Sequence, residues 1–347
     1  MTPRERWLAV LKREQPDRVP MDYWATSEVT DKLKKHLGVE TDDEMCERLH
    51  IDRPVGIEPT YAGPKIPEDH DEYGLQYRMV DYGTGAYKEA VNSPLAQYGS
   101  IEEIERNYTW PSPDWYDYSA IPASIRGKEH RPVVGGGSEP FLLYKNLRGE
   151  AQAFMDLIMN PEIVRHCLDK LFAFAYENTR RIYEAIPGQV LYSYVAEDMG
   201  AQEDLMYAPE QIREFFLPWM KKMTDLVHDA GGYVFHHNDG AIRKIIPDMI
   251  GIGIDVLNPI QWRCKGMERQ GLKRDFGDRL VFHGGMDNQH TLPFGSVDDV
   301  RQEVLDNLRI LGAGGGYIIA PCHNIQPVTP PQNIVALYEA GYEYGWT

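Results

Sequence analysis

From residue 131 onward the chain alternates between short runs of β-branched and aromatic residues and longer stretches with helical periodicity. We predict a strand at each short run and a helix after it. The predicted strands are 131–141, 189–198, 233–239, 254–260, 280–287 and 316–322. Regular alternation of strand and helix indicates right-handed βαβ units, whose strands lie parallel in one sheet.

The N-terminal third follows a different pattern. Residues 2–13 have helical periodicity, and 19–25 (VPMDYWA) predict a first strand. Residues 50–130 are rich in Pro, Tyr, Asp and Gly, which indicates an excursion of loops and short strands that covers or lines a site and could supply one more strand. We therefore predict a single (β/α)₈ TIM barrel over residues 1–347, with an N-terminal helical and loop excursion over its mouth. The glycines at 135–137 lack the GxGxxG spacing of a dinucleotide-binding fold.

Polar side chains cluster where the predicted strands end. In a (β/α)₈ barrel the carboxyl ends of all strands point into one mouth, where active sites lie. The residues at or near these ends are Asp22, Glu139, Glu197, Asp198, His236, His237, Asp239, Asn258, Asp287, Cys322 and His323. So many reactive groups at one end of a barrel favour an enzyme. For a single carboxylate the alternative is a helix N-cap, and Asp239 directly precedes the helix expected at 241–251.

The composition of the chain excludes some classes of binding partner and indicates a cellular compartment. The formal net charge of −17 argues against a nucleic-acid-binding surface and against an anionic membrane surface. The four cysteines are far apart, so neither a disulfide framework nor a zinc knuckle is expected. With no apolar signal segment and no run of about 18 apolar residues, we expect a cytoplasmic protein.

Several blocks resemble one known family, the uroporphyrinogen decarboxylase superfamily. They include TPRERWLAVLKREQPDRVP, HHNDG, VFHGGMDNQHTLPFG and APCHNIQPVTPPQNIVAL. The resemblance implies a (β/α)₈ barrel and one of two activities. One branch decarboxylates uroporphyrinogen without a metal. The other moves methyl groups to or from a corrinoid cofactor, with a zinc ion held by His-x-Cys and a distant Cys.

The decarboxylase branch is the second choice. Its members open with an arginine-containing segment that binds the substrate carboxylates, whereas residues 19–30 contain no arginine. A polyanionic substrate would lose its strongest charge-assisted contacts there. The alignment with the methyltransferase branch places His237 on the zinc-binding histidine, Asp239 on the first cysteine and Cys322 on the second. A zinc site of His237, Asp239 and Cys322 is therefore expected, and His236, His323 or Glu197 could stand in. The alternative makes Asp239 an N-cap and Cys322 a buried thiol.

The exchange of a thiolate for a carboxylate suggests a chemistry. A harder zinc suits polarisation of an oxygen, as in a methyl ether, so we expect demethylation of a small methylated or methoxylated compound. No Asp-x-His-x-x-Gly motif is present, so the resemblance implies that a partner protein carries the corrinoid. Whether the chain forms a homodimer is left open. The sequence also leaves open a catalytically inactive scaffold or a small-molecule sensor.

Roles were assigned to the remaining residues at the mouth. Glu197, Asp198 and His236 are predicted to be catalytic, the two carboxylates as a general acid or as orienters of His237. Substrate binding is assigned to Glu139, Asn258, Asp287 and His323.

Overall fold

The centre of the molecule is a parallel β-sheet. The computed structural model describes residues 1–81 and 86–346. Seven strands pair in the order β1-β6-β7-β8-β9-β10-β11, and every neighbouring pair is parallel. They are β1 (Val55–Ile57), β6 (Val133–Ser138), β7 (Tyr192–Val195), β8 (Tyr233–His237), β9 (Val256–Asn258), β10 (Val281–Met286) and β11 (Tyr317–Pro321). The parallel α/β fold predicted from the alternating pattern is confirmed.

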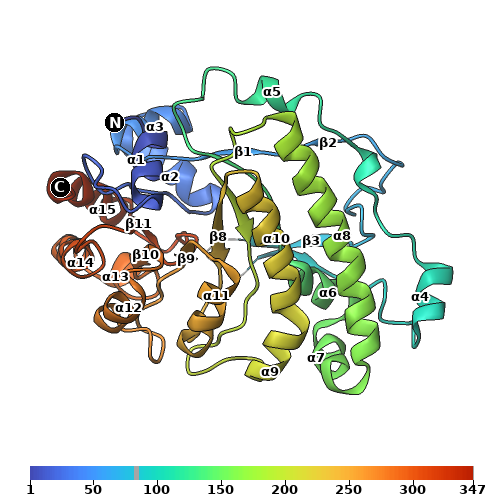
Figure 1. Ribbon diagram of the computed structural model, residues 1–347. Helices are drawn as coiled ribbons and strands as arrows, with labels where there is room; N and C mark the ends of the chain where they lie inside the picture. Colours follow the sequence, from blue (N-terminus) through green and yellow to red (C-terminus); the bar gives the residue numbers. More distant parts are fainter. Residues whose placement is uncertain (82–85, 347) are drawn as a thin grey trace.

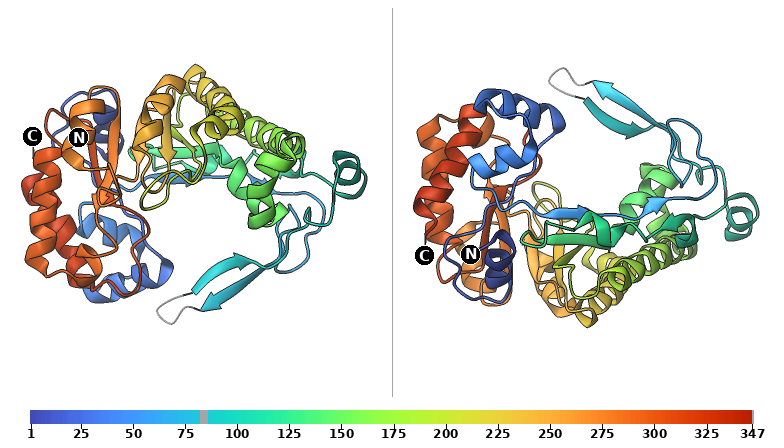
Figure 2. Two further views of the ribbon diagram at one scale, coloured as in Figure 1. Left: turned by 90° about the horizontal axis from the view of Figure 1, so that it is seen from below. Right: turned by 90° about the horizontal axis from the view of Figure 1, so that it is seen from above.

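Helices cover the outer side of the curved sheet (Figures 1 and 2). β10 and β11 are buried at every position, as expected of strands covered on both faces. The helices after β6 are α6 (Pro140–Arg148), α7 (Glu150–Met159), α8 (Pro161–Ala185), α9 (Pro209–Gln211), α10 (Leu217–Asp229), α11 (Ile246–Ile252), α12 (Arg269–Phe276), α13 (Thr291–Phe294), α14 (Val297–Ile310) and α15 (Pro331–Tyr344). Short 3₁₀ or π turns occupy Pro113–Trp115, Ile212–Phe216 and Arg243–Ile245.

The first helix closes one end of the inner face of the sheet. α1 (Pro3–Leu11) begins with a capping box, in which Thr2 accepts from the Glu5 amide and the Glu5 side chain accepts from Thr2. Trp7 of α1 is fully buried and stacks on Tyr192 of β7, with ring centroids 5.3 Å apart. The predicted helix at 2–13 is therefore confirmed, and it contributes to the apolar cluster inside the sheet.

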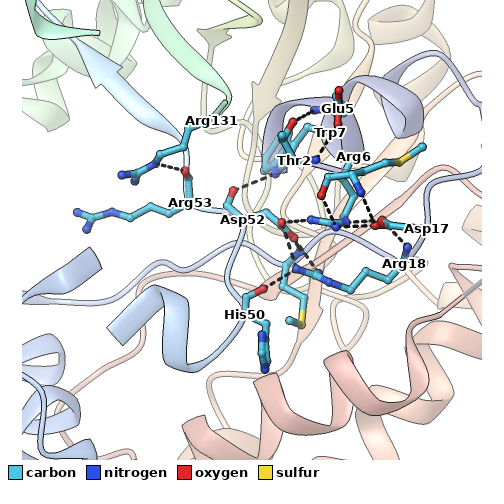
Figure 3. Close-up of polar contacts among 12 residues, drawn as sticks. Thr2, Glu5, Arg6, Trp7, Asp17, Arg18, His50, Asp52, Arg53 and Arg131 are labelled. Carbon is cyan, nitrogen blue, oxygen red and sulfur yellow. Dashed lines mark hydrogen bonds and ion pairs between the residues drawn. The ribbon is translucent and has the colours of Figure 1, made fainter. Parts of the chain in front are cut away.

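A buried ion cluster ties the N-terminal segment to the chain that enters β1 (Figure 3). Asp52 accepts hydrogen bonds from Arg6 (2.5 Å) and Arg18 (2.8 Å), and all three side chains are almost fully buried. Arg6 also pairs with Asp17 through two nitrogens, at 2.6 and 2.8 Å. Because each guanidinium shares carboxylates across different segments, the cluster fixes α1 against the start of the sheet.

The segment predicted as the first strand differs from the prediction. Residues 19–25 form single bridges, Met21 to Ile319 and Ala25 to Ile325, both parallel, instead of a strand. The Asp22 amide donates to Ile319 at 2.8 Å, and the Asp52 amide donates to Met21 at 2.8 Å. The segment therefore lies between β11 and the chain before β1. The closed eight-stranded barrel stays a prediction.

The excursion predicted over residues 50–130 supplies β1 to the main sheet, and its described residues after β1 form short elements. They include the antiparallel pairs β2 (Thr60–Tyr61) with β5 (Tyr116–Asp117) and β3 (Tyr77–Asp81) with β4 (Ala86–Ala90), and the helices α4 (Ile101–Asn107) and α5 (Ile121–Ser124). The β3–β4 hairpin projects away from the rest of the molecule (Figure 2). Two further helices, α2 (Ser27–Leu37) and α3 (Asp42–Arg48), follow the N-terminal segment. Within the described residues no helix is both long and apolar enough to span a membrane.

Candidate functional site

The loops after β7 and β8 meet at the carboxyl end of the sheet. The Asp239 amide donates to the Asp198 carboxylate at 3.0 Å, and the Glu197 amide donates to the His237 carbonyl at 3.1 Å. Gly200 and Gly240 allow this approach: a Cβ on Gly200 would lie 2.4 Å from the Asp239 carbonyl, and Gly240 has a φ of +85°. The two loops therefore hold their carboxylates beside His237.

Three side chains at this end could bind one metal ion. Single ligand atoms of His237, Asp239 and His323 all lie within 4.8 Å of one another. His237 Nε2 lies 3.8 Å from an oxygen of Asp239 and 3.8 Å from an oxygen of Asp198. Two imidazoles and a carboxylate are a donor set that zinc accepts, and a fourth position would be left for a substrate.

A chain of buried hydrogen bonds fixes which nitrogen of His237 faces the carboxylates. Asp22 Oδ2 accepts from the Trp24 indole at 2.9 Å and from His283 Nε2 at 3.0 Å. His283 Nδ1 then accepts from the Asn258 amide nitrogen at 2.7 Å, so the Asn258 oxygen accepts from His237 Nδ1 at 2.6 Å. With its proton on Nδ1, neutral His237 presents the lone pair of Nε2 to Asp198 and Asp239.

Aromatic rings pack against His237. Trp24 stacks on the His237 ring with centroids 5.9 Å apart, and Tyr194 stacks on it at 5.7 Å. His323 approaches the same ring at 6.0 Å in a tilted arrangement. These contacts restrict the orientation of the His237 ring, whose Nε2 lies 3.8 Å from an oxygen of Asp239.

The carboxylates at this end repel one another. Burial, together with the charge of Asp198, raises the pKa of Glu139 to about 7. Burial also raises the pKa of Asp239, although His237 opposes the shift. Carboxyl groups in this state favour a nearby cation, and Glu139 can both hold and release a proton near neutral pH.

Two residues predicted to be catalytic have structural partners. Glu197 is buried and accepts from the amides of Phe141 (2.9 Å) and Leu142 (3.1 Å), so it caps the start of α6. His236 is fully buried, and its Nδ1 donates to the Val195 carbonyl at 2.6 Å. Burial lowers the pKa of His236 to about 4. Of the three residues predicted to be catalytic, the structure brings Asp198 to the metal-binding group.

The three side chains that converge include two of the expected ligands, His237 and Asp239, and also His323, which the sequence named as a residue that could stand in. Cys322 is not one of these three: its buried thiol donates to the Ile260 carbonyl at 3.2 Å, and burial raises its pKa. His323, assigned to substrate binding, takes the third place instead. Both residues follow the end of β11 at Pro321, so the loop conformation decides which side chain lies close to His237.

Asn258 and Asp287 also have partners that the sequence did not indicate. Asn258 orients His237, as described above. Asp287 pairs with Arg263 and accepts from the amides of Gln289 (2.9 Å) and His290 (3.3 Å), so it holds the loop after β10. Sequence reasoning missed His283, although one histidine inside the buried strand VFHGG was a detectable signal.

Comparisons with known proteins agree with this fold. A uroporphyrinogen decarboxylase (URO-D) family model matches residues 80–344. The methylcobamide:CoM methyltransferase MtaA of Methanosarcina barkeri is 26% identical over 213 residues, which cover 61% of this chain and 58% of that protein. A uroporphyrinogen decarboxylase of Pseudomonas syringae pv. syringae (strain B728a) is 27% identical over 238 residues, which cover 65% and 62%. The chain thus spans about three fifths of the length of these relatives.

A solved structure shows the same fold over the whole chain. The methyltransferase from Methanosarcina mazei superposes with a TM-score of 0.68 at 21% identity, covering 99% of each chain. The family resemblance inferred from the sequence blocks is confirmed, since the family model covers most of the chain. The protein belongs to the uroporphyrinogen decarboxylase family.

Proposed function

We propose that the protein transfers a methyl group between a small methylated or methoxylated compound and a corrinoid cofactor carried by another protein, with a zinc ion held by His237, Asp239 and His323. The observation that carries the proposal is the convergence of these three ligand atoms within 4.8 Å. The methyltransferases among the relatives support the same class of reaction.

The residues present fit a zinc ion. His237 is held in the tautomer that offers a lone pair at Nε2, because Asn258 accepts its Nδ1 proton. Asp198 adds a second negative group at 3.8 Å from Nε2, which further favours a divalent cation. When bound, zinc in this nitrogen and oxygen set would act as a Lewis acid on an oxygen of the substrate.

Glu139 supplies a proton in this proposal. Its pKa of about 7 leaves a substantial protonated fraction near neutral pH. A carboxyl group in this state can protonate an alkoxide or phenoxide leaving group as the methyl group departs. Trp24 and Tyr194 pack against the His237 ring and help to keep its Nε2 directed at the substrate position.

The charge at the mouth disfavours the decarboxylase alternative. Uroporphyrinogen carries many carboxylates, whereas Glu139, Asp198 and Asp239 present negative groups there. Like charges across a binding site cost affinity. The absence of arginine from residues 19–30 points the same way.

We also infer that residues 19–22 occupy the place of an eighth strand and close the sheet. The backbone bonds of Asp22 to Ile319 and of Asp52 to Met21 support this closure. In this arrangement residues 58–130 lie beside the mouth, within a single domain.

The test combines metal analysis with a transfer assay. The purified protein is mixed with a reduced corrinoid carrier protein and a panel of methoxylated and methylated compounds, and the absorbance of the methylated corrinoid is followed. We expect about one zinc per chain and methylation that is lost on metal removal. His323→Ala should lower zinc content strongly, whereas Cys322→Ser, the matched change of the neighbouring residue, should leave it intact.

Three results would contradict the proposal: no methylated corrinoid with any compound, equal rates with metal-stripped protein, or carbon dioxide release from uroporphyrinogen. The last result would favour the decarboxylase alternative. If Cys322→Ser loses zinc and His323→Ala retains it, the ligands are His237, Asp239 and Cys322, as predicted from the sequence.

A further inference from the structure

A cavity lies close to His237, beside Tyr194. It has a volume of about 500 Å³ and is bounded by the ends of β1 and β6, by α8 and by the excursion. Tyr194 belongs to its wall and also stacks on His237, with centroids 5.7 Å apart. Tyr194 therefore belongs both to the wall of this cavity and to the surroundings of His237.

Three consecutive glycines hollow out the strand side of the cavity. A Cβ on Gly135 would lie 2.5 Å from Ile57, and one on Gly136 would lie 2.7 Å from Thr179. At Gly137, with a φ of +120°, a Cβ would lie 1.9 Å from the Tyr194 carbonyl. Side chains at these positions would collide with the walls or occupy the space, so the GGG run keeps the cavity open.

The lining combines aromatic faces with carboxylates. Tyr116, Phe174 and Tyr194 contribute rings, and Glu58 and Glu72 contribute negative charge. Among the described residues that line the cavity there is no lysine, arginine or histidine. The cavity therefore has negative potential and no cation of its own to neutralise it.

Glu72 is held at the wall with its charge uncompensated. Tyr116 donates its hydroxyl proton to Glu72 at 2.6 Å, which fixes the carboxylate without neutralising it. Burial and the charge of Glu72 raise the pKa of Tyr116 and of Tyr73. No ion pair found within the described part of the chain includes Glu72. Burial and the charges of Glu139 and Asp198 raise the pKa of Tyr194.

We propose that this cavity binds the positively charged group of an organic ammonium compound, and that the compound whose methyl group is exchanged carries this charge. The second half rests on the proposed function. An ammonium group against aromatic faces gains cation–π attraction, and desolvation strengthens that attraction. Apolar neighbours such as Ile57 and Ile182 suit the alkyl groups of such a compound, whereas a hydrated metal ion would leave them unused.

Choline and 3,3-dimethyl-1-butanol make a matched pair of probes, since they have the same shape and differ in charge. Both are titrated by calorimetry into the full chain, with and without zinc. We expect choline to bind at least about tenfold more tightly than the neutral alcohol. Glu72→Gln should remove most of this difference. Glu102→Gln, which removes the same charge from an exposed site on α4, should keep it.

Two results would overturn the proposal. One is equal affinity for the two probes, and the other is a preference for choline that survives Glu72→Gln. Phe174→Leu provides a second variant: it keeps every charge and should lower choline affinity more than alcohol affinity. Choline binding without zinc or methyl transfer would overturn the proposed function but keep the cavity assignment. Zinc binding and methyl transfer without choline binding would support the proposed function and overturn the cavity assignment.

Discussion

Replacing Asp22 by asparagine tests the hydrogen-bond chain that directs His237. Asp22 accepts from His283 Nε2 at 3.0 Å, and this acceptor sets the direction of every later bond to His237. An asparagine amide could donate to His283 instead. Asn258 would then turn over, and the proton of His237 would move from Nδ1 to Nε2, the nitrogen that faces Asp239.

The expected effect is a loss of metal affinity. A protonated Nε2 cannot bind zinc, so the variant must restore the original tautomer before it binds. Loss of an orienting partner of a metal-binding histidine usually lowers affinity about 10- to 100-fold. That range corresponds to about 1.4–2.7 kcal/mol. Because Asp22 lies three hydrogen bonds from His237 Nε2, no direct contact explains a loss of this size.

Two measurements separate this effect from general damage. Zinc affinity is determined by competition with a chromophoric chelator, and ring nitrogen shifts are recorded by NMR. His236 serves as an internal reference, because its Nδ1 donates to the Val195 carbonyl outside the chain from Asp22. Asp17→Asn, the same change in the ion cluster of α1, serves as the control variant. Unchanged zinc affinity together with an unchanged His237 tautomer in Asp22→Asn would refute the reasoning.

Three other outcomes are expected. The transfer rate should fall as pH rises through about 7, because Glu139 loses its proton there. The Glu139→Gln variant should be slow at every pH. If its rate still falls as pH rises through about 7, Glu139 is not the acid. Asp52→Ala should lower the free energy of unfolding by about 3–5 kcal/mol in urea, because Arg18 would lose its carboxylate partner and keep a buried charge, while Arg6 would keep only Asp17. Gly137→Ala should cost about 2–3 kcal/mol in the same assay, since its Cβ would overlap a carbonyl of β7; a fully stable variant would contradict that geometry.

The sequence predicted the sheet because its pattern is local. Each strand from β6 to β11 lies within a predicted run, since apolar residues continue through strands that are buried on both faces. Residues 19–25 failed as a strand because only single bridges, at Met21 and Ala25, join them to the C-terminal part. The length of a strand at 19–25 depends on how many residues of other segments pair with it, and the local sequence pattern does not show this.

The candidate site was predicted less completely than the fold. His237 and Asp239 were found because they follow a strand end, but a pattern does not tell which of Cys322 and His323 points inward. Both follow the end of β11, where the direction of each side chain depends on the conformation of the loop. The partners of His236 and Asn258 come from other strands, and such contacts are settled only when the sheet assembles.

The bond from the Tyr338 hydroxyl to the Asp22 carbonyl has a consequence for biosynthesis. It joins positions 316 apart at 2.8 Å, so the segment beside β11 gains this partner only when α15 has been made. During synthesis the backbone groups of Asp22 and its neighbours stay exposed to water and to other chains until these partners have been made. Long-range closure of this kind is slow, and it leaves nascent chains open to misassociation. Premature termination before residue 331 would therefore leave the N-terminal segment without its partner on α15.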